Sequence, residues 1–504
     1  MPALGGYLLY GDAGNVCSDV LTWPSSSAHP HARMSDIDTE AKVLGKTTKY
    51  CLTSAALIIT IGNKKPQTVP LHNVIAASYH SNARLLEIAY VIRLKKKGPL
   101  HLVHLNGQVE ESNAEAAGNL ATTTLEWAYK DVKPNRRLKV LINPHGGVGK
   151  GVAIFNKLVE PVFRAAGCIL DFVHTTKTGD AYEIAKSLPL PEYDALITVS
   201  GDGLIHEVLN GFSNHAYPRK ALQMPVAPIP TGSGNGLSLN LLGIEDGFDV
   251  VAASLNVIKG SPMPVDVFCF TQNGQRTISF MSQAVGLMAD VDLGTEDLRW
   301  MGDTRFMYGL LRGLIKFKPC NVQLSYKAVE QDKKKMFENL NFRRSQNGSV
   351  VPRENQGDNS ELPESKIGLD ETEGWTTFPE PLLYLYAGKG PYVGRDLMAF
   401  PVSLPDDGLI DIVVQSTKNF SRTDVLASFG GAPKGELYWN DSLHYVKAEA
   451  YRIKPLSKKG YLSIDGESYP FEEFQVEVLP KLATLLSSHG YYNASFDDVT
   501  ARKK

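Results

Sequence analysis

The segment DALITVSGDGLIHEVLNGF, residues 194–212, changes from a strand-like pattern to a helical pattern. Its first part is a run of mostly apolar and β-branched residues, which is typical of a buried strand. Its last part places apolar residues three and four positions apart, which indicates one face of a helix. Asp202 stands between two glycines at the point where the strand would end. A strand that passes through a glycine loop into a helix is typical of an α/β sheet.

The same pattern recurs on both sides of this segment. The strand-like runs RLKVLIN (137–143), CILDFVHTT (168–176) and MPVAPIP (224–230) each precede a stretch with helical spacing. Strands that alternate with helices in this way predict an α/β domain with a mostly parallel sheet. Because such sheets bind ligands beyond the carboxyl ends of their strands, we expect the following loops to meet in one crevice.

Three of these loops are rich in glycine, namely NPHGGVGKG (143–151), SGDG (200–203) and PTGSGNGLS (230–238). Glycine lets the backbone approach a phosphate closely, and the N-terminus of the following helix presents free amide groups. The loops therefore indicate a nucleotide site, although none matches the P-loop or the dinucleotide fingerprint. Asp202 would then be a general base or a ligand for Mg²⁺, and the alternative is that it only caps its helix.

Composition and charge exclude several classes of protein. The chain has 504 residues, with 52 Lys and Arg against 54 Asp and Glu, so its net charge is −2. This balance excludes a globally basic surface, and we expect no nucleic-acid partner. The five cysteines form no CxxC pair, which favours a reducing compartment over a disulfide framework. No uncharged apolar run of about 18 residues occurs, so any membrane contact is expected to be peripheral.

Changes of pattern divide the chain into five parts. Beyond the α/β region the sequence is rich in strand-like runs, which predicts a second domain that resembles a β-sandwich or open barrel. Within it, residues 329–376 are polar and poor in aliphatic side chains, and we interpret them as a disordered insertion. The predicted parts are a flexible tail (1–40), a small β-rich module (41–132), the α/β domain (133–260), the β-rich domain (261–485) and a C-terminal tail (486–504). The small module is either structural support or a binding module for a lipid or a protein partner.

Taken together and in this order, the three glycine loops resemble the catalytic domain of the diacylglycerol kinase and sphingosine kinase superfamily. SGDG at 200–203, where the superfamily usually has GGDG, resembles the sphingosine and ceramide kinase branch. Four further segments are similar to sphingosine kinase motifs: SPMPVDVF (261–268), MADVDLGTEDLRWMGDTRFMYG (288–309), LPDDGLIDIVV (404–414) and LSIDGESY (462–469). The resemblance covers roughly residues 135–480 apart from the polar insertion.

This resemblance implies a kinase that uses ATP and Mg²⁺ to phosphorylate the primary hydroxyl of sphingoid long-chain bases, giving the base 1-phosphate. The α/β domain would bind the nucleotide and the β-rich domain the lipid. A ceramide or diacylglycerol kinase with the same catalytic domain is the alternative, and an NAD kinase fits SGDG less well. The non-enzymatic alternative is a lipid-binding protein without kinase activity. The presence of Asp202 argues against this alternative. The implied location is cytoplasmic and peripheral to a membrane, while the oligomeric state stays open.

The resemblance also implies roles for particular residues. Asp202 would be the catalytic base, Asp266 would bind the amine and hydroxyl of the lipid head group, and Arg276 would reach the transferring phosphate. Asp465 and Glu467 would hold Mg²⁺. Ser200, Gly201 and Gly203 would contact the substrate as well as the nucleotide. The implied nucleotide contacts are Asn143, Pro144, His145, Gly146, Gly147, Thr175, Thr176, Lys177, Thr178, Gly179, Ser200, Gly201, Gly203, Glu207, Thr231, Gly232, Ser233, Gly234, Arg276, Asp465, Gly466 and Glu467.

Several of these residues also have a plain structural interpretation. Asp266 would be a solvated residue at the start of a strand, Arg276 a surface residue at a strand end, and Asp465-Gly466 a β-turn. His145 stands where the family can have a basic residue, which puts one phosphate contact in doubt. The helical run TRFMYGLLRGLIKF (304–317) is either packed in the core or a lid over the lipid tail that touches an anionic membrane.

Overall fold

The computed structural model describes residues 37–43, 45–147, 149–294, 308–309, 319–346, 361–368, 371–418 and 429–497. The chain divides into two compact units, Met1–Ala128 and Tyr129–Lys504. Most of the predicted tail at 1–40 and of the helical run at 304–317 lies outside the described residues. No helix in the described part of the chain is both long enough and apolar enough to cross a membrane.

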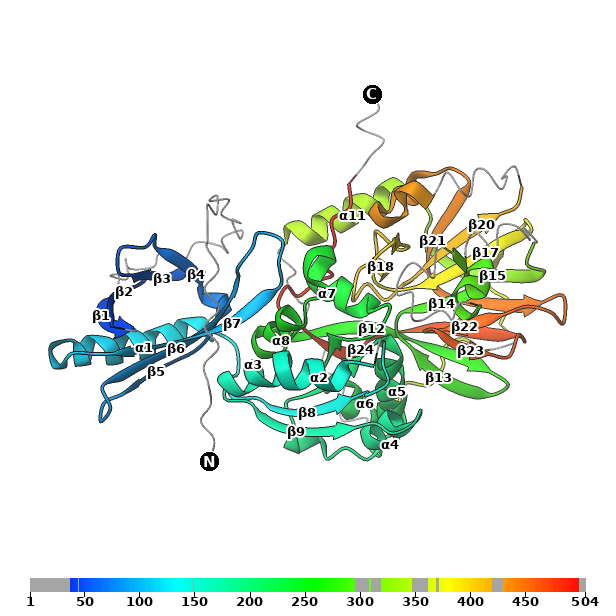
Figure 1. The fold of residues 1–504 in the computed structure, drawn as a ribbon. Coiled ribbons are helices and arrows are strands. Elements are labelled where there is room, and N and C mark those ends of the chain that lie inside the picture. Colours follow the sequence, from blue (N-terminus) through cyan, green and yellow to red (C-terminus); the bar gives the residue numbers. More distant parts are fainter. Residues whose placement is uncertain are drawn as a thin grey trace, which may run out of the picture. The chain divides into compact units, whose positions relative to one another are not determined.

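The first unit is a seven-stranded antiparallel sheet followed by a helix (Figure 1). Its strands are β1 Ile37–Val43, β2 Lys46–Leu52, β3 Ala56–Ile61, β4 Gln67–Pro70, β5 Val74–His80, β6 Leu85–Arg93 and β7 Leu100–Gln108, in the order β4-β3-β2-β1-β7-β6-β5. Buried and open positions alternate along β1, so one face of the sheet forms the core. Helix α1, Ala114–Ala128, buries Ala117, Leu120, Ala121 and Thr124, which are spaced as one helix face. The predicted β-rich module therefore exists as a compact unit.

The second unit begins with the predicted α/β arrangement. Strands β8 Arg137–Ile142, β9 Ile169–His174, β10 Ala195–Ser200 and β11 Val226–Pro230 are parallel, in the order β11-β10-β8-β9. The helices are α2 Gly151–Ile154, α3 Glu160–Ala165, α4 Asp180–Lys186, α5 Asp202–Ser213, α6 Pro218–Leu222, α7 Gly236–Asp246 and α8 Val250–Lys259. The helix predicted after β8 is interrupted by a π-helical stretch at Phe155–Val159, just before Pro161. Proline has no N–H to continue the α-helical ladder, which accounts for the interruption.

The rest of the second unit is rich in strands. They are β12 Ser261–Gln272, β13 Gln275–Ser279, β14 Ser282–Gly286, β15 Val322–Glu330, β16 Thr376–Thr377, β17 Leu382–Gly388, β18 Tyr392–Gly394, β19 Leu397–Met398, β20 Ile410–Ser416, β21 Leu443–Pro455, β22 Leu462–Ile464, β23 Glu467–Tyr469 and β24 Phe474–Ser487, with α9 Leu287–Leu293 after β14. The long strand β24 pairs with β12 and β21 and also, at Leu485, with Val226 of β11. The two predicted domains of this unit therefore share one hydrogen-bonded sheet, which Figure 1 shows running between the labels β22 and β9.

The polar segment 329–376 differs from its prediction as a disordered insertion. Helix α11 occupies Lys333–Ser345, and the Asp332 side chain caps it by accepting hydrogen bonds from the amides of Lys334 and Lys335. Met336 and Leu340 are buried in an apolar cluster of the β-rich part. Two apolar anchors one helical turn apart and a strong N-cap are enough to fix this helix, although its composition is otherwise polar. Residues 347–360 and 369–370 lie outside the described part.

Candidate active site

A cleft of about 390 Å³ opens at the carboxyl ends of β8, β10 and β11. This is where ligands bind in open parallel sheets, and the volume is within the range of a small-molecule site. The glycine loops form one wall, and α9, β17 and the β18–β19 and β22–β23 turns form the other. The lining residues are Asn143, Gly146, Gly147, Thr178, Ser200, Gly201, Asp202, Gly203, Leu204, Glu207, Gly232, Ser233, Gly234, Met281, Ser282, Met288, Val291, Asp292, Tyr386, Val393, Gly394, Arg395, Asp396, Leu397, Asp465, Gly466 and Glu467.

The three glycine loops are packed backbone against backbone. A Cβ atom added to Gly232 would lie 2.3 Å from the Cα atom of Gly201. A Cβ atom added to Gly147, whose φ is +58°, would lie 2.3 Å from the carbonyl oxygen of Thr231. Only glycine fits at these two positions, so the loops approach closely and their backbones form the floor of the cleft. This confirms the expectation that the loops meet in one crevice.

Asp202 is the first residue of α5, but its side chain does not cap that helix. Its Oδ2 atom accepts a hydrogen bond from the amide of Gly236 at 2.7 Å, and its Oδ1 atom accepts one from Leu237 at 3.1 Å. These amides are the first two of α7, so the carboxylate faces the positive end of a second helix. Burial raises the pKa of Asp202 to about 6. The negative charge of Asp465 raises this pKa further, while the two amide hydrogen bonds lower it. Asp202 is thus ionised at neutral pH and suited to accept a proton.

Asp465 occupies the two-residue turn between β22 and β23, with φ +50° for Asp465 and +87° for Gly466. Asp-Gly is favoured in such turns because both positions need positive φ. The Asp465 carboxylate accepts hydrogen bonds from Ser279 Oγ, the amides of Phe280, Met281 and Ser282, and His206 Nδ1. Donors therefore surround both of its oxygens, so Asp465 does not fit the role of a direct Mg²⁺ ligand.

Glu467, the other predicted Mg²⁺ ligand, has different surroundings. It is exposed on the cleft wall, and a Cβ atom added to Gly203 would lie 3.5 Å from its Oε1 atom. Among the residues that the structure describes, no group of three or more His, Cys, Asp or Glu side chains forms a metal site. A carboxylate such as Glu467 suits Mg²⁺, which proteins usually hold through one or two carboxylates together with the phosphates of a substrate.

His206 connects α5 to this turn. Its Nδ1 atom lies 2.8 Å from Asp465 Oδ2, and Asn210 Nδ2 lies 3.3 Å from its Nε2 atom. Asn210 in turn exchanges hydrogen bonds with the backbone of Ile278 on β13. Burial lowers the pKa of His206, but the hydrogen bond and the charge of Asp465 outweigh it and leave the pKa raised. The network holds the β-rich wall against the helix that carries Asp202.

Many predicted nucleotide contacts line the cleft, and the others do not. Glu207 lines the cleft and accepts hydrogen bonds from the amides of Gly179 and Ala181, at 3.0 and 3.2 Å. The Asp180 side chain accepts from Thr176 and Lys177, which holds the TTKTG loop in place. The predicted nucleotide residues that do not line the cleft are Pro144, His145, Thr175, Thr176, Lys177, Gly179, Thr231 and Arg276.

The prediction for Asp266 as the head-group residue disagrees with the structure. Asp266 is 1% exposed and lies 2.5 Å from Lys389 Nζ, inside the sheet. It also accepts hydrogen bonds from the amides of Gly408 and Lys481. The apolar residues around it in β12 bury this strand almost completely, so the carboxylate faces the interior and not the cleft.

Arg276, the predicted phosphate contact, is also displaced from the cleft. It lies on β13, where Nε donates to Cys269 Sγ at 3.0 Å and Nη2 donates to the carbonyl of Pro363 at 2.9 Å. The side chain thus points along β12 and towards the segment at 361–368, and it does not line the cleft.

Two acidic residues and one basic residue of the cleft wall were not predicted. Asp292 lies on α9 and accepts a hydrogen bond from Ser463 Oγ at 2.5 Å. Its signal was present in the segment 288–309, where Met288, Val291 and Asp292 share one side of a short helix. Arg395 and Asp396 occupy the β18–β19 turn, and the polar pair within VGRDLM was their only signal.

The charges on the cleft wall are strongly unbalanced. Its lining includes six carboxyl residues, namely Asp202, Glu207, Asp292, Asp396, Asp465 and Glu467, while Arg395 is the one lysine or arginine of that lining among the described residues. Apolar side chains form a second part of the wall: Leu204, Met281, Met288, Val291, Tyr386, Val393 and Leu397. Such a site favours a ligand with a cationic head and an apolar chain, and a polyphosphate ligand would need a cation to enter.

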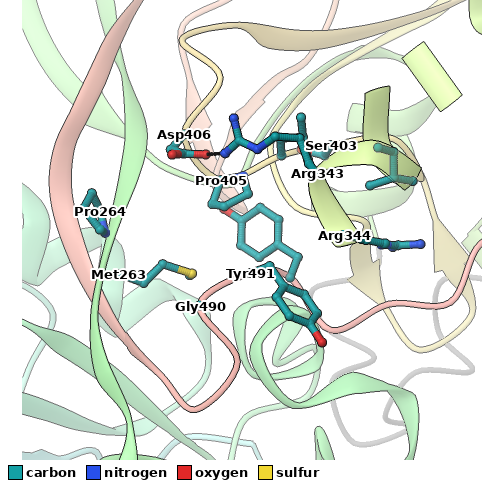
Figure 2. A pocket seen from close by; sticks show the side chains of 12 residues that line it. Met263, Pro264, Arg343, Arg344, Ser403, Pro405, Asp406, Gly490 and Tyr491 are labelled. Carbon is teal, nitrogen blue, oxygen red and sulfur yellow. Dashed lines mark hydrogen bonds and ion pairs between the residues drawn. The ribbon is translucent and has the colours of Figure 1, made fainter. Parts of the chain in front are cut away.

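A second cavity, shown in Figure 2, is much smaller. Its volume is about 30 Å³, and Arg343, Arg344, Asp406 and Tyr491 contribute to its walls. Arg343 forms an ion pair with Asp406, drawn as a dashed line in the figure. This space is far smaller than a small-molecule site, so the cavity cannot hold a nucleotide or a lipid.

Comparisons with known proteins point to one family of enzymes. The diacylglycerol kinase catalytic domain family matches residues 137–270. Sphingoid long chain base kinase 4 of Schizosaccharomyces pombe is 36% identical over 371 residues, which cover 72% of this chain and 77% of that protein. Sphingoid long chain base kinase 5 of Saccharomyces cerevisiae is 26% identical over 98% of this chain and 78% of its own length. Sphingosine kinase 1 of Homo sapiens is 29% identical over 70% of this chain and 91% of its own length.

Proposed function

The chain belongs to the family of sphingoid long-chain base kinases, and on that basis we propose that it transfers the γ-phosphoryl group of ATP to the primary hydroxyl of a sphingoid long-chain base. The products are the base 1-phosphate and ADP. The observation that carries the proposal is the Asp202 carboxylate, which lies at the floor of the cleft between the glycine loops and an acidic, partly apolar wall.

The glycine loops would hold the phosphates of ATP. Gly201 and Gly232 bring two strand ends into contact, and their backbone is open to the cleft without interference from side chains. When bound with ATP, Mg²⁺ would neutralise much of the phosphate charge. This neutralisation is needed because six carboxyl residues line the cleft and would otherwise repel the phosphates. Glu467 would face this cation, while Asp465 holds the turn in place.

Asp202 would act as the general base. As the hydroxyl oxygen of the lipid forms its bond to the γ-phosphorus, the bond between that phosphorus and the β–γ bridging oxygen breaks. The hydroxyl proton passes to Asp202, and ADP leaves with the bridging oxygen. The two amides of α7 keep the carboxylate fixed in direction, so little reorganisation is needed for the proton to move.

Asp292 would recognise the head group in place of Asp266. Its carboxylate lies on the cleft wall beside Met288 and Val291 of the same helix. A carboxylate next to apolar side chains suits a protonated amine that is joined to an alkyl chain. Ceramide and diacylglycerol have no such amine, so this residue supports the free base as substrate. The β-rich part at 261–485 would hold the lipid chain.

Location follows from the proposed chemistry. The substrate is a membrane lipid and ATP is a cytoplasmic nucleotide, so the enzyme would work at the cytoplasmic face of a membrane. Among the described cysteines, Cys168, Cys269 and Cys320 carry free thiols, which suits a reducing compartment. The run at 304–317 would take part in lipid entry, and it lies almost entirely outside the described residues.

The test is phosphate transfer from γ-labelled ATP with Mg²⁺ to lipids in uncharged detergent micelles. The lipids are sphingosine, dihydrosphingosine, phytosphingosine, ceramide and diacylglycerol. We expect label on the free bases, its loss in Asp202→Asn, and its retention in Asp396→Asn, an exposed acid of the same wall. Label on ceramide or diacylglycerol alone would contradict the substrate assignment, and label that persists in Asp202→Asn would contradict the role of the base.

A further inference from the structure

A row of side chains crosses three strands beside the cleft. Ala284 of β14 lies opposite Tyr386 of β17 on one side and opposite Ser463 of β22 on the other. Residues directly opposite one another in antiparallel strands share a face, so these three side chains point to the same side of the sheet. Ser282 precedes Ala284 by two positions and shares that face. Three hydroxyl groups therefore stand on one face, and two of their residues, Tyr386 and Ser282, line the cleft.

One end of this row belongs to the proposed partner of the substrate amine. Ser463 Oγ donates a hydrogen bond to Asp292 Oδ2 at 2.5 Å. In a sphingoid base the amine is on C2 and a hydroxyl is on the neighbouring carbon C3, so one carboxylate can bind both groups. A hydroxyl on C4 is one carbon further along the chain. A site that recognises this hydroxyl therefore needs a second polar group.

Tyr386 stands at the other end of the row. It is the one side chain with a hydroxyl in the apolar part of the described cleft lining. It is 8% exposed, and its ring centroid lies 5.4 Å from that of the buried Phe400, so the phenol has little freedom to move. Burial raises the pKa of Tyr386, and the nearby charge of Asp292 raises it further. The phenol is therefore neutral at physiological pH and keeps a proton that it can donate.

Ser282 influences how this hydroxyl can be used. The hydrogen bond with Ser282 lowers the pKa of Tyr386, which is the effect of a donor on the phenol oxygen. The serine thus donates, and the O–H group of Tyr386 itself remains available to a ligand. A buried tyrosine hydroxyl usually has a hydrogen-bond partner, and a ligand in the cleft can supply the acceptor. A phenylalanine at this position would give the same apolar wall without this polar contact.

We propose that Tyr386 recognises a hydroxyl group on C4 of the sphingoid base and makes the enzyme favour bases that carry it. This inference rests on the proposed function and on Asp292 as the partner of the amine. With the amine at one end of the row, C4 reaches the other end, where the Tyr386 O–H donates to the oxygen on C4. A base without this hydroxyl places a methylene group against a buried donor, which weakens its binding.

The experiment is a competition between two substrates that differ only in this hydroxyl. Phytosphingosine carries a hydroxyl on C4, and dihydrosphingosine of the same chain length has a methylene group there. Both are offered together in uncharged micelles with γ-labelled ATP and Mg²⁺, and the ratio of labelled products gives the ratio of their kcat/KM values. We expect the unmodified chain to favour phytosphingosine. Tyr386→Phe should lower the ratio of phytosphingosine to dihydrosphingosine at least about fivefold.

Tyr384→Phe is the matched control. Tyr384 is two positions earlier on β17, shares the face of Tyr386 and is 7% exposed, but it does not line the cleft. This variant also loses one buried phenol hydroxyl and should keep the ratio of the unmodified chain. Thermal melting of both variants checks that the fold persists.

Two results would overturn the role of Tyr386 while the proposed function stands. The first is an unchanged ratio in Tyr386→Phe, with both bases labelled. The second is an equal fall of the ratio in both variants, because a packing effect would then account for it. If the unmodified chain labels neither base, the proposed function is wrong, and this inference falls with it. The two kinds of failure are therefore distinguishable in one assay.

Discussion

His206 Nδ1 lies 2.8 Å from Asp465 Oδ2, and this buried pair joins residues 259 positions apart in the chain. One partner belongs to the helix that carries Asp202, and the other to the turn that precedes Glu467. The parallel sheet and the β-rich part therefore meet through a charged hydrogen bond as well as through the strand β24. The geometry of the cleft depends on both connections.

Replacing His206 should loosen this connection. His206→Gln removes a charge-assisted hydrogen bond from a buried carboxylate, which costs on the order of 1.5–3 kcal/mol of stability. Because the pKa of His206 is raised in the folded state, its contribution is fully present below its unfolded pKa and is lost as pH rises through the folded pKa. The difference in melting temperature between His206→Gln and the unmodified chain should thus be larger at pH 6 than at pH 9. A difference that does not depend on pH would show that the histidine is not charged in the pair.

Asp202→Asn should abolish turnover while the fold persists. Loss of a general base lowers rates by about 10²–10⁴-fold, and the asparagine side chain still fills the space between α5 and α7. The unmodified enzyme should lose kcat/KM below pH 6, since the base must be ionised and its pKa is raised to about 6. Steady-state kinetics from pH 5 to pH 8 measures this limb, and circular dichroism checks the fold. A flat profile down to pH 5 would contradict the role of Asp202.

Asp266→Asn should lower stability, whereas Asp292→Asn should weaken substrate binding. Asp266 is paired with buried Lys389, and breaking a buried pair costs about 3–5 kcal/mol. Its substitution should lower the melting temperature markedly. Asp292 lines the cleft, so its substitution should raise KM for sphingosine with little change in melting temperature. If Asp266→Asn alone raised KM for sphingosine, the result would contradict the role of Asp292 and show that Asp266 binds the head group.

Gly232→Ala should damage the nucleotide site through backbone contact. The added methyl group would stand 2.3 Å from Gly201 Cα, so two of the glycine loops must separate. We expect ATP binding, measured by calorimetry in the presence of Mg²⁺, to weaken at least about tenfold. Gly394→Ala is the matched control, because Gly394 lines the same cleft and a Cβ atom there would meet nothing within 4 Å. Equal affinities for the two variants would exclude a role for close loop packing.

The sequence predicted the parts of the site that depend on local motifs. The glycine loops follow β8, β10 and β11, as the alternation of strands and helices indicated. Asp202 was identified from its place between two glycines, and the structure adds that it caps α7, which is 34 residues away in sequence. No local pattern could have given that contact, because it depends on how two loops pack.

The errors have physical causes that the sequence partly contained. Asp266 lies in PVDVFCF, a continuous apolar run of the kind that forms a strand buried on both faces, so its carboxyl group had to be internal. Asp292 shares one side of a short helix with Met288 and Val291, and this spacing was not used in the prediction. Helix α11 was missed because the polar composition of 329–376 outweighed the capping residue Asp332. The pairing of β24 with β11 could not be predicted from the sequence, because no local pattern connects residues 226 and 485.

That last pairing has a consequence for synthesis on the ribosome. The outer edge of β11 is covered by a strand whose pairing residue is translated 259 residues after its partner, since Leu485 of β24 pairs with Val226 of β11. At about 5–20 residues per second, the nascent parallel sheet exposes an unpaired edge for roughly tens of seconds. The unit cannot complete its fold vectorially, domain after domain. A chain that is released early would therefore carry all three glycine loops and still lack the strand that closes their sheet.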